Sequence, residues 1–167
     1  LAEPMEVEKA ALALDAALPR GIRVLAADAV DTHHAALMSQ AAGASYRVTL
    51  PYSKDVSAAV AEFNAAPELL FKKAAPKTKA KFKEIDVKFY IPQLTAEQTE
   101  KETIFSFDCK ITPTGSMKAV DLLNALNEQY GLELPVEMAD IERLRLYRNN
   151  KNGKPIPMLN SDAVILG

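Results

Sequence analysis

Apolar residues stand at every second position in several segments after residue 43, which is the pattern of a strand with one buried face. In the first of these segments the apolar residues alternate with Arg47 and Thr49. The same alternation marks two longer segments, and two shorter apolar runs accompany them. The pattern predicts strands over residues 46–50, 69–73, 85–91, 105–111 and 141–147.

Two of these strands have clearly defined apolar faces. The predicted buried face of the third strand holds Ile85, Val87, Phe89 and Ile91. That of the fourth strand holds Phe105, Phe107, Cys109 and Ile111.

Two segments between the strands have apolar residues at helical spacing. The first predicted helix begins after Ser53, a suitable N-cap, and ends before Pro67. The second begins after Ser116, another suitable N-cap, and ends near Gly131. The order strand, helix, two or three strands, helix, strand predicts an α+β fold. Its expected form is the ferredoxin-like βαββαβ arrangement, in which two helices cover one face of an antiparallel sheet.

The segments outside this arrangement are less regular. The first third predicts a helix over 6–18, a strand over 22–29 and a short helix from Thr32 to Gly43. We therefore expect a helix–strand–helix region (1–43), a ferredoxin-like domain (44–150) and a C-terminal tail (151–167). The apolar residues 163–166 favour packing of the tail against the sheet over a loose end.

The composition excludes several classes of protein. The chain has 167 residues, of which 49% are hydrophobic and 25% are charged, as in one globular domain or two small ones. With a formal net charge of −2, the chain lacks the overall positive charge that is typical of nucleic-acid-binding proteins. No apolar run approaches the ~20 residues of a membrane helix, and the first residues lack the pattern of a signal peptide. With a single cysteine, an internal disulfide is impossible, so we expect a cytoplasmic protein without a membrane partner.

The residues that most often carry chemistry are few. His33 and His34 are adjacent, so they point in different directions on a helix and cannot both face one metal ion. Cys109 lies on an apolar strand face, where a cysteine behaves as a small hydrophobic residue. No nucleotide-binding, zinc-protease or serine-hydrolase motif occurs. We expect no catalytic residue, no metal site and no cofactor.

One charge feature rises above this background, a cluster of seven lysines between residues 72 and 88, with only Glu84 and Asp86 among them. The lysines are Lys72, Lys73, Lys77, Lys79, Lys81, Lys83 and Lys88. A straight strand cannot place both these lysines and the following apolar residues well. We therefore expect a turn or bulge near residues 81–84, with the lysines on a hairpin.

This hairpin has two interpretations. In the first, the lysines are solvated and protect a sheet edge from aggregation. In the second, they contact RNA or phosphate, together with Arg143, Arg145 and Arg148 of the last strand. We favour the first, because lysines are common at sheet edges and only Phe82 offers an aromatic ring among them.

The turn at residues 112–116 is a second candidate for phosphate binding. Gly115, Ser116 and the first amides of the following helix would meet there, and a helix N-terminus attracts anions. The chain lacks the lysine spacing of a phosphate-binding loop, so a turn followed by an N-cap is the stronger interpretation.

Several segments together resemble a known family. They are Ala16–Leu25 (AALPRGIRVL), Ala44–Val48 (ASYRV), Lys83–Lys88 (KEIDVK), Thr112–Lys118 (TPTGSMK) with Leu122 and Leu123, and Ile141–Arg143 (IER) with Leu146 and Tyr147. Their order resembles that of the bacterial radical-SAM-linked proteins, a family of unknown function that is encoded beside radical SAM proteins or fused to them. Members usually begin with further stretches, F-S-H-L-D and G-F-N-P-H-P, which this chain lacks. The resemblance therefore implies the C-terminal part of such a protein, with residues 1–43 as the remnant of a preceding ferredoxin-like unit.

Two functions follow as expectations. The resemblance implies a non-catalytic accessory domain that associates with a radical SAM protein and helps to present its substrate. The iron–sulfur chemistry would belong to that partner, because a cluster needs several cysteines. The alternative is an RNA-binding module that uses the lysine-rich hairpin. An independent enzyme is disfavoured, because no nucleophile–base or acid–base pair stands out.

Overall fold

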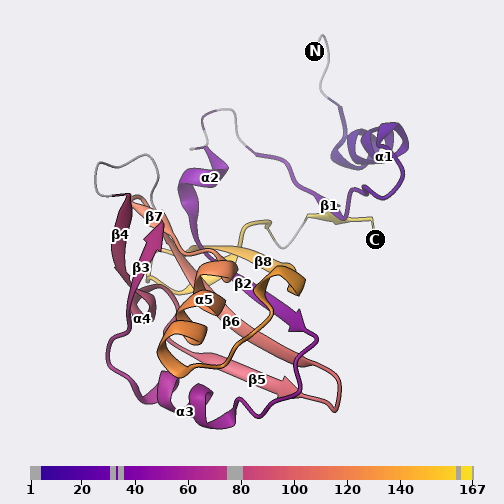
Figure 1. The fold of residues 1–167 in the computed structure, drawn as a ribbon. Coiled ribbons are helices and arrows are strands. Elements are labelled where there is room, and N and C mark those ends of the chain that lie inside the picture. The colour runs from indigo at the N-terminus through magenta and orange to yellow at the C-terminus, as the bar shows by residue number, and fades with distance from the viewer. Residues whose placement is uncertain (1–4, 31–32, 34–35, 75–80, 161–162, 167) are drawn as a thin grey trace. The chain divides into compact units, whose positions relative to one another are not determined.

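The computed structural model describes residues 5–30, 33, 36–74, 81–160 and 163–166 (Figure 1). The chain divides into two compact units. The smaller consists of Leu1–Gln40 with Pro157–Gly167, and the larger of Ala41–Ile156. The predicted tail is shared, because β9 (Pro155–Pro157) joins the sheet of the larger unit while β10 (Val164–Ile165) pairs with the smaller unit's β1.

The smaller unit has little regular structure. Its elements are α1 (Val7–Ala17), β1 (Ala26–Ala27), α2 (Leu37–Gln40) and β10, which pairs antiparallel with β1. The predicted first helix is confirmed, but the predicted strand over 22–29 shrinks to two residues. Asp15 explains this difference, because its carboxylate accepts hydrogen bonds from the Val24 backbone N–H at 2.7 Å and from the Arg23 side chain at 3.0 Å. The backbone at 23–24 is therefore fastened to α1 rather than to another strand.

The second predicted helix of this region is also shorter than expected. It covers only Leu37–Gln40, and its expected cap, Thr32, lies outside the described residues. Gly43 was expected to close this helix. It instead lies within β2 (Ala41–Leu50), so that prediction was wrong.

The larger unit is an α+β structure built on one sheet with the strand order β5-β6-β2-β8-β9. The pairs β5–β6, β6–β2 and β2–β8 are antiparallel. The further elements are α3 (Ser57–Ala65), β3 (Leu70–Ala74), β4 (Phe82–Asp86), α4 (Val87–Tyr90), β5 (Leu94–Gln98), β6 (Thr103–Thr112), β7 (Gly115–Ser116), α5 (Ala119–Tyr130), a 3-10 turn (Val136–Met138) and β8 (Asp140–Asn149).

The core of this unit lies between one face of the sheet and the helices α3 and α5 (Figure 1). Phe63 of α3 and Leu122 of α5 are fully buried in the same cluster as Val48 of β2 and Phe105 of β6. Val48 and Phe105 are directly opposite each other in the sheet. The alternation along β2 and β6 therefore assigns one face of the sheet to the core.

The segment 85–91 was predicted as a strand, and this was wrong beyond Asp86. Val87, Tyr90 and Ile91 are buried, whereas Phe89 is 51% exposed. Burial at 87, 90 and 91 is helical spacing, because Val87–Tyr90 form the single turn α4 and Ile91 caps its C-terminus. Asp86 begins the turn, because its carboxylate accepts from the Lys88 backbone N–H at 2.9 Å.

The strand that takes its place is β5, which the sequence pattern missed. Leu94 is fully buried opposite Phe107, and Ala96 lies opposite Phe105. The side chain of Asn64 fixes the start of β5, since it donates to the Leu94 carbonyl at 2.8 Å and accepts from the Leu94 N–H at 2.9 Å.

Both predicted N-caps were wrong as well. α3 begins at Ser57, whose N–H donates to the Asp55 carboxylate at 2.8 Å, and not after Ser53. α5 begins at Ala119 with Lys118 as its N-cap, while Ser116 pairs with Ile111 in β7.

A buried threonine joins the β5–β6 hairpin to the loop after β2. The Thr103 hydroxyl donates to the Tyr52 carbonyl at 2.6 Å and accepts from the Gln98 side-chain amide at 2.8 Å. The side chain is fully buried.

We expect Thr103→Val to lower the free energy of unfolding by about 2 kcal/mol, because it keeps the shape but leaves a buried carbonyl without its donor. Urea denaturation measures the change. The control is Thr95→Val on the exposed side of β5, for which we expect a change within about 0.5 kcal/mol. Equal denaturation midpoints for the two variants would contradict the assigned role of Thr103.

Candidate functional site: the open face of the sheet

The face of the sheet opposite the core is polar, and we call it the open face. It carries the side chains that alternate with the buried ones along β2 and β6. Its members are Thr95, Glu97, Ile104, Ser106, Asp108, Lys110, Ser45, Arg47, Thr49, Asp140, Glu142, Arg145 and Tyr147, with Gly43 at one end of β2. Most of them are exposed or half-buried.

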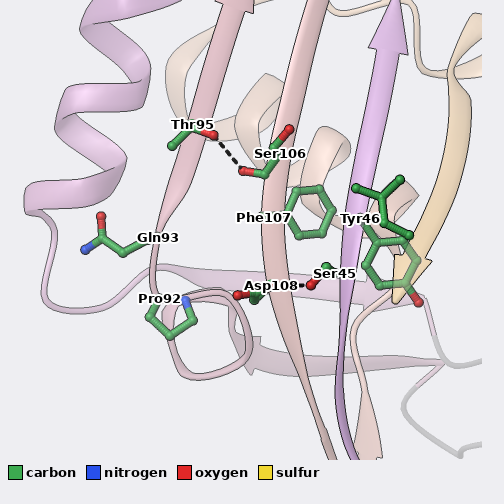
Figure 2. A pocket seen from close by; sticks show the side chains of 9 residues that line it. Ser45, Tyr46, Pro92, Gln93, Thr95, Ser106, Phe107 and Asp108 are labelled. Atoms are coloured by element: carbon green, nitrogen blue, oxygen red, sulfur yellow. Dashed lines mark hydrogen bonds between the residues drawn. The ribbon is translucent and has the colours of Figure 1, made fainter. Parts of the chain in front are cut away.

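A hollow of about 440 Å³ lies on this surface (Figure 2). Figure 2 shows Thr95, Ser106, Asp108 and Ser45 around it, and residues from the segment before β5 close one side. The residues that line it are Ser45, Tyr46, Pro92, Gln93, Thr95, Ser106, Phe107, Asp108 and Leu144.

The best-defined polar contact in the hollow joins two neighbouring strands. The Ser45 hydroxyl donates to the Asp108 carboxylate at 2.5 Å, and the two residues are directly opposite each other in β2 and β6. On the other side of β6, the Thr95 hydroxyl donates to the Ser106 carbonyl at 3.2 Å. These groups provide hydrogen-bond donors and acceptors for a polar ligand.

Charge is unevenly distributed along the open face. Lys110 and Arg145 flank Gly43 and Ser45 at one end of the sheet. Near the other end, Glu142 lies 3.6 Å from the Arg47 guanidinium, and Glu97 and Asp140 follow. The sheet therefore has a cationic end and a mainly acidic end.

An aromatic side chain lies at the cationic end. The Tyr147 ring covers Gly43, so closely that a Cβ atom at Gly43 would overlap the Tyr147 hydroxyl and ring. Burial raises the pKa of the Tyr147 hydroxyl, and the negative charge of Asp108 adds to this shift. Tyr147 is therefore neutral at physiological pH.

The structure separates the predicted lysines into different environments. Lys72, Lys81 and Lys83 are exposed, and β3 pairs with β4, which confirms the predicted hairpin. The turn or bulge expected near residues 81–84 was wrong in its place, because the pairing of β4 is regular from Phe82 to Asp86. Lys77 and Lys79 lie outside the described residues. Lys73 forms an ion pair with Asp121 at 2.7 Å, with 24% and 16% of the two side chains exposed, and so connects the hairpin to the first turn of α5.

Lys88 has a structural environment as well. Its ammonium donates to the Pro92 carbonyl at 2.6 Å and lies 4.4 Å from the centre of the Phe63 ring. Burial lowers the pKa of this ammonium.

The other candidate residues, Gly115 and Ser116, do not cap α5. Gly115 and Ser116 form β7 against the end of β6. The carboxylate of Asp121 accepts from the Lys118 N–H at 3.2 Å, so the first turn of α5 already holds an anion. Phosphate binding at Gly115 and Ser116 stays a prediction.

The predicted arginines are all on β8. Arg145 is opposite Ser45 and belongs to the open face, whereas Arg143 is opposite Tyr46, next to a bulge in the pairing with β2. Arg143 and Arg145 are both exposed.

Cys109 is buried with 1% of its surface exposed, as predicted. Burial raises the pKa of its thiol. Of the two histidines, His33 is exposed and His34 lies outside the described residues. Among the residues that the structure describes, no group of three or more metal-binding side chains comes together. None of the helices in this described part has the length and apolar character needed to cross a membrane.

The sequence patterns did not identify the open face as a site. Ser45, Asp108 and Tyr147 lie far apart along the chain, and none belongs to a recognisable motif. Their polar positions within predicted strands were visible, but only the strand register shows which of them are neighbours.

A comparison with protein-family models matches residues 1–127 to a family described as "Uncharacterized protein conserved in bacteria (DUF2344)". Searches of curated proteins and of solved structures found no match. The family match agrees with the resemblance as far as an uncharacterised bacterial family. The link to a radical SAM protein stays a prediction.

We expect Lys73→Met to lower the free energy of unfolding by about 1 kcal/mol, because it leaves the partly buried Asp121 carboxylate without its cation. The control is Lys72→Met on the exposed side of the same strand, with an expected change within about 0.5 kcal/mol. Thermal or urea denaturation compares the two. If Lys73→Met is as stable as the control, the ion pair does not hold the hairpin to α5.

We expect Cys109 to react slowly with a thiol reagent at pH 8 in the native protein and rapidly in urea. Its raised pKa keeps the folded thiol protonated at a pH where an exposed thiol is partly ionised. The control is the double variant Cys109→Ala with Lys110→Cys, which moves the thiol to the open face. Equal native rates for Cys109 and for this control would show that the thiol is accessible.

Proposed function

The chain belongs to the DUF2344 family of uncharacterised bacterial proteins, and on that premise we propose that it is a non-catalytic accessory domain of a radical SAM protein. In this proposal the domain associates with that protein and helps to present its substrate. The radical SAM partner follows from the resemblance of the segments between residues 16 and 143.

The observation that carries the proposal is the open face with its hollow of about 440 Å³. Helices α3 and α5 cover the other face of the sheet, so the polar groups at Ser45, Ser106 and Asp108 remain accessible. A concave surface with a few polar groups is typical of a binding site.

The chemistry of these groups favours binding over catalysis. The Ser45 hydroxyl donates to the Asp108 carboxylate, and a carboxylate is a weaker base for activating a serine than the imidazole that usually does so. The chain's single cysteine is buried, so an iron–sulfur cluster would have to be held by the partner.

We also propose that the larger unit is a ferredoxin-like domain. The strand order β5-β6-β2-β8, with α3 between β2 and β5 and α5 between β6 and β8, supports this assignment. In this assignment β5, and not the segment 85–91, is the second strand of the βαββαβ order.

RNA binding is the second candidate function. It is favoured by the exposed lysines Lys72, Lys81 and Lys83 on the β3–β4 hairpin and by the exposed Arg143 and Arg145 on β8. These cations offer phosphate contacts in a protein whose net charge is −2. The two functions are compatible, because a substrate presented to a radical SAM protein can be RNA.

The test is co-purification from the bacterial host at mild salt, before and after ribonuclease. We expect a radical SAM protein to be recovered with the tagged full-length protein after ribonuclease. We expect Ser106→Arg, which fills the hollow, to reduce this recovery at least tenfold. The control is Asn124→Arg on the exposed side of α5, which we expect to leave recovery unchanged.

The outcomes separate the candidates. Absence of a radical SAM protein would overturn the accessory function. Equal recovery with Ser106→Arg would show that the partner does not bind through the open face. RNA recovered with the wild type and lost when Lys72 and Lys83 are changed to Gln would support the second candidate. RNA binding should also weaken steeply as the salt concentration rises. In a plot of the logarithm of the binding constant against that of the salt concentration, each phosphate-contacting lysine that is changed to Gln should reduce the slope by about 0.7.

A further inference from the structure

At the cationic end of the open face, Gly43, Tyr147 and Lys110 form an arrangement that neither proposed function uses. By strand register, Gly43 of β2 lies between Lys110 of β6 and Tyr147 of β8. Because Gly43 has no side chain, the Tyr147 ring can extend over the backbone of β2. Gly43 thus leaves a space on the sheet surface that the Tyr147 ring occupies, and we call this space the aromatic seat.

The next row of the sheet places a second cation beside the ring. Asp108, Ser45 and Arg145 are neighbours across the three strands, and Arg145 precedes Tyr147 by two residues on the same strand. The two cations of this end, Lys110 and Arg145, are both exposed, and neither takes part in an ion pair with another described residue. The nearby acid, Asp108, accepts the hydrogen bond from Ser45.

A second aromatic ring lies near the same end. Phe89 of α4 is 51% exposed, and the Lys110 ammonium lies 5.3 Å from the centre of its ring. An exposed phenylalanine beside a cation is a suitable surface for a second base.

We propose that this end of the sheet, formed by Tyr147 on Gly43 with Lys110 and Arg145, binds single-stranded RNA through one stacked base. The base stacks on the Tyr147 ring, and Lys110 and Arg145 contact the phosphates on either side of that nucleotide. Asp108 provides an acceptor for a ribose 2′-hydroxyl or a base amino group. The inference rests on RNA binding as the function, and it assigns the contact with the single strand to the cationic end of the open face.

Charge and ring chemistry together favour this ligand over others. A protein partner with an acidic surface would use the two cations but would not need the aromatic seat. Double-stranded RNA keeps its bases stacked inside the duplex and does not offer a base face to Tyr147. A single strand offers an unpaired base that can stack on the Tyr147 ring and phosphates that can contact the two cations.

The chain contains no tryptophan, and this makes a direct test possible. In the full chain carrying Tyr147→Trp, we expect the emission of the introduced tryptophan to be quenched as a single-stranded oligo(A) or oligo(U) RNA is added at low salt. The matched control is Tyr130→Trp on α5, whose emission should not change. Far-UV circular dichroism of both variants checks that they are folded.

Affinity measurements with a labelled oligonucleotide complete the test. We expect Tyr147→Phe to bind as the wild type does and Tyr147→Leu to bind about tenfold more weakly, because leucine fills the seat but has no ring face. Gly43 is unchanged in both variants.

The outcomes distinguish this inference from RNA binding itself. If the wild type binds RNA while the introduced tryptophan is not quenched and Tyr147→Leu binds equally, the stacking site is wrong and RNA binding stands. If the wild type does not bind single-stranded RNA even at low salt, both are wrong. Quenching at position 147 together with weaker binding by Tyr147→Leu supports both.

Discussion

The pairing of β2 along both of its edges is the constraint on which the rest of the larger unit depends. From Gly43 to Thr49, β2 is hydrogen-bonded to β6 on one side and to β8 on the other, although these strands come from distant parts of the chain. Because both edges of β2 are hydrogen-bonded, its side chains can point only to one or the other face of the sheet. From Ala44 to Leu50 its side chains therefore alternate between the core and the open face, even though the pairing with β8 shifts between Ser45 and Tyr46, and this alternation creates both surfaces.

The same constraint explains the chemistry of the open face. Val48 and Leu50 are buried in the core together with Phe105. The side chains that alternate with them along β2 therefore point to the open face, where they lie beside side chains of β6 and β8. Ser45, Asp108 and Arg145 thereby become neighbours, and Gly43 leaves room for the Tyr147 ring. A polar, concave surface on a rigid sheet is suited to the recognition of another molecule.

The sequence predicted the elements whose patterns are unambiguous. These are α1, the apolar faces of β2 and β6, the lysine-bearing hairpin, β8 and the buried Cys109. It failed at α4, because residues 85–91 satisfy a two-residue period as well as a helical one. It missed β5, because Thr95–Gln98 is polar and rich in helix-forming residues and becomes a strand only through pairing with β6. The open face was unpredictable for a related reason, since its members become neighbours only when the register between strands is known.

We propose the open face of the sheet as the surface through which the molecule binds its partner. The most direct test replaces Ser106 on the open face, or Glu128 on the exposed side of α5, with a photo-crosslinking amino acid in the full-length protein. The protein is irradiated in its bacterial host, and the products are identified by mass spectrometry. We expect the residue in place of Ser106 to crosslink to a radical SAM protein or to RNA, and we expect no such crosslink from the residue in place of Glu128. Crosslinks to these partners from the α5 position alone, or from neither position, would contradict it.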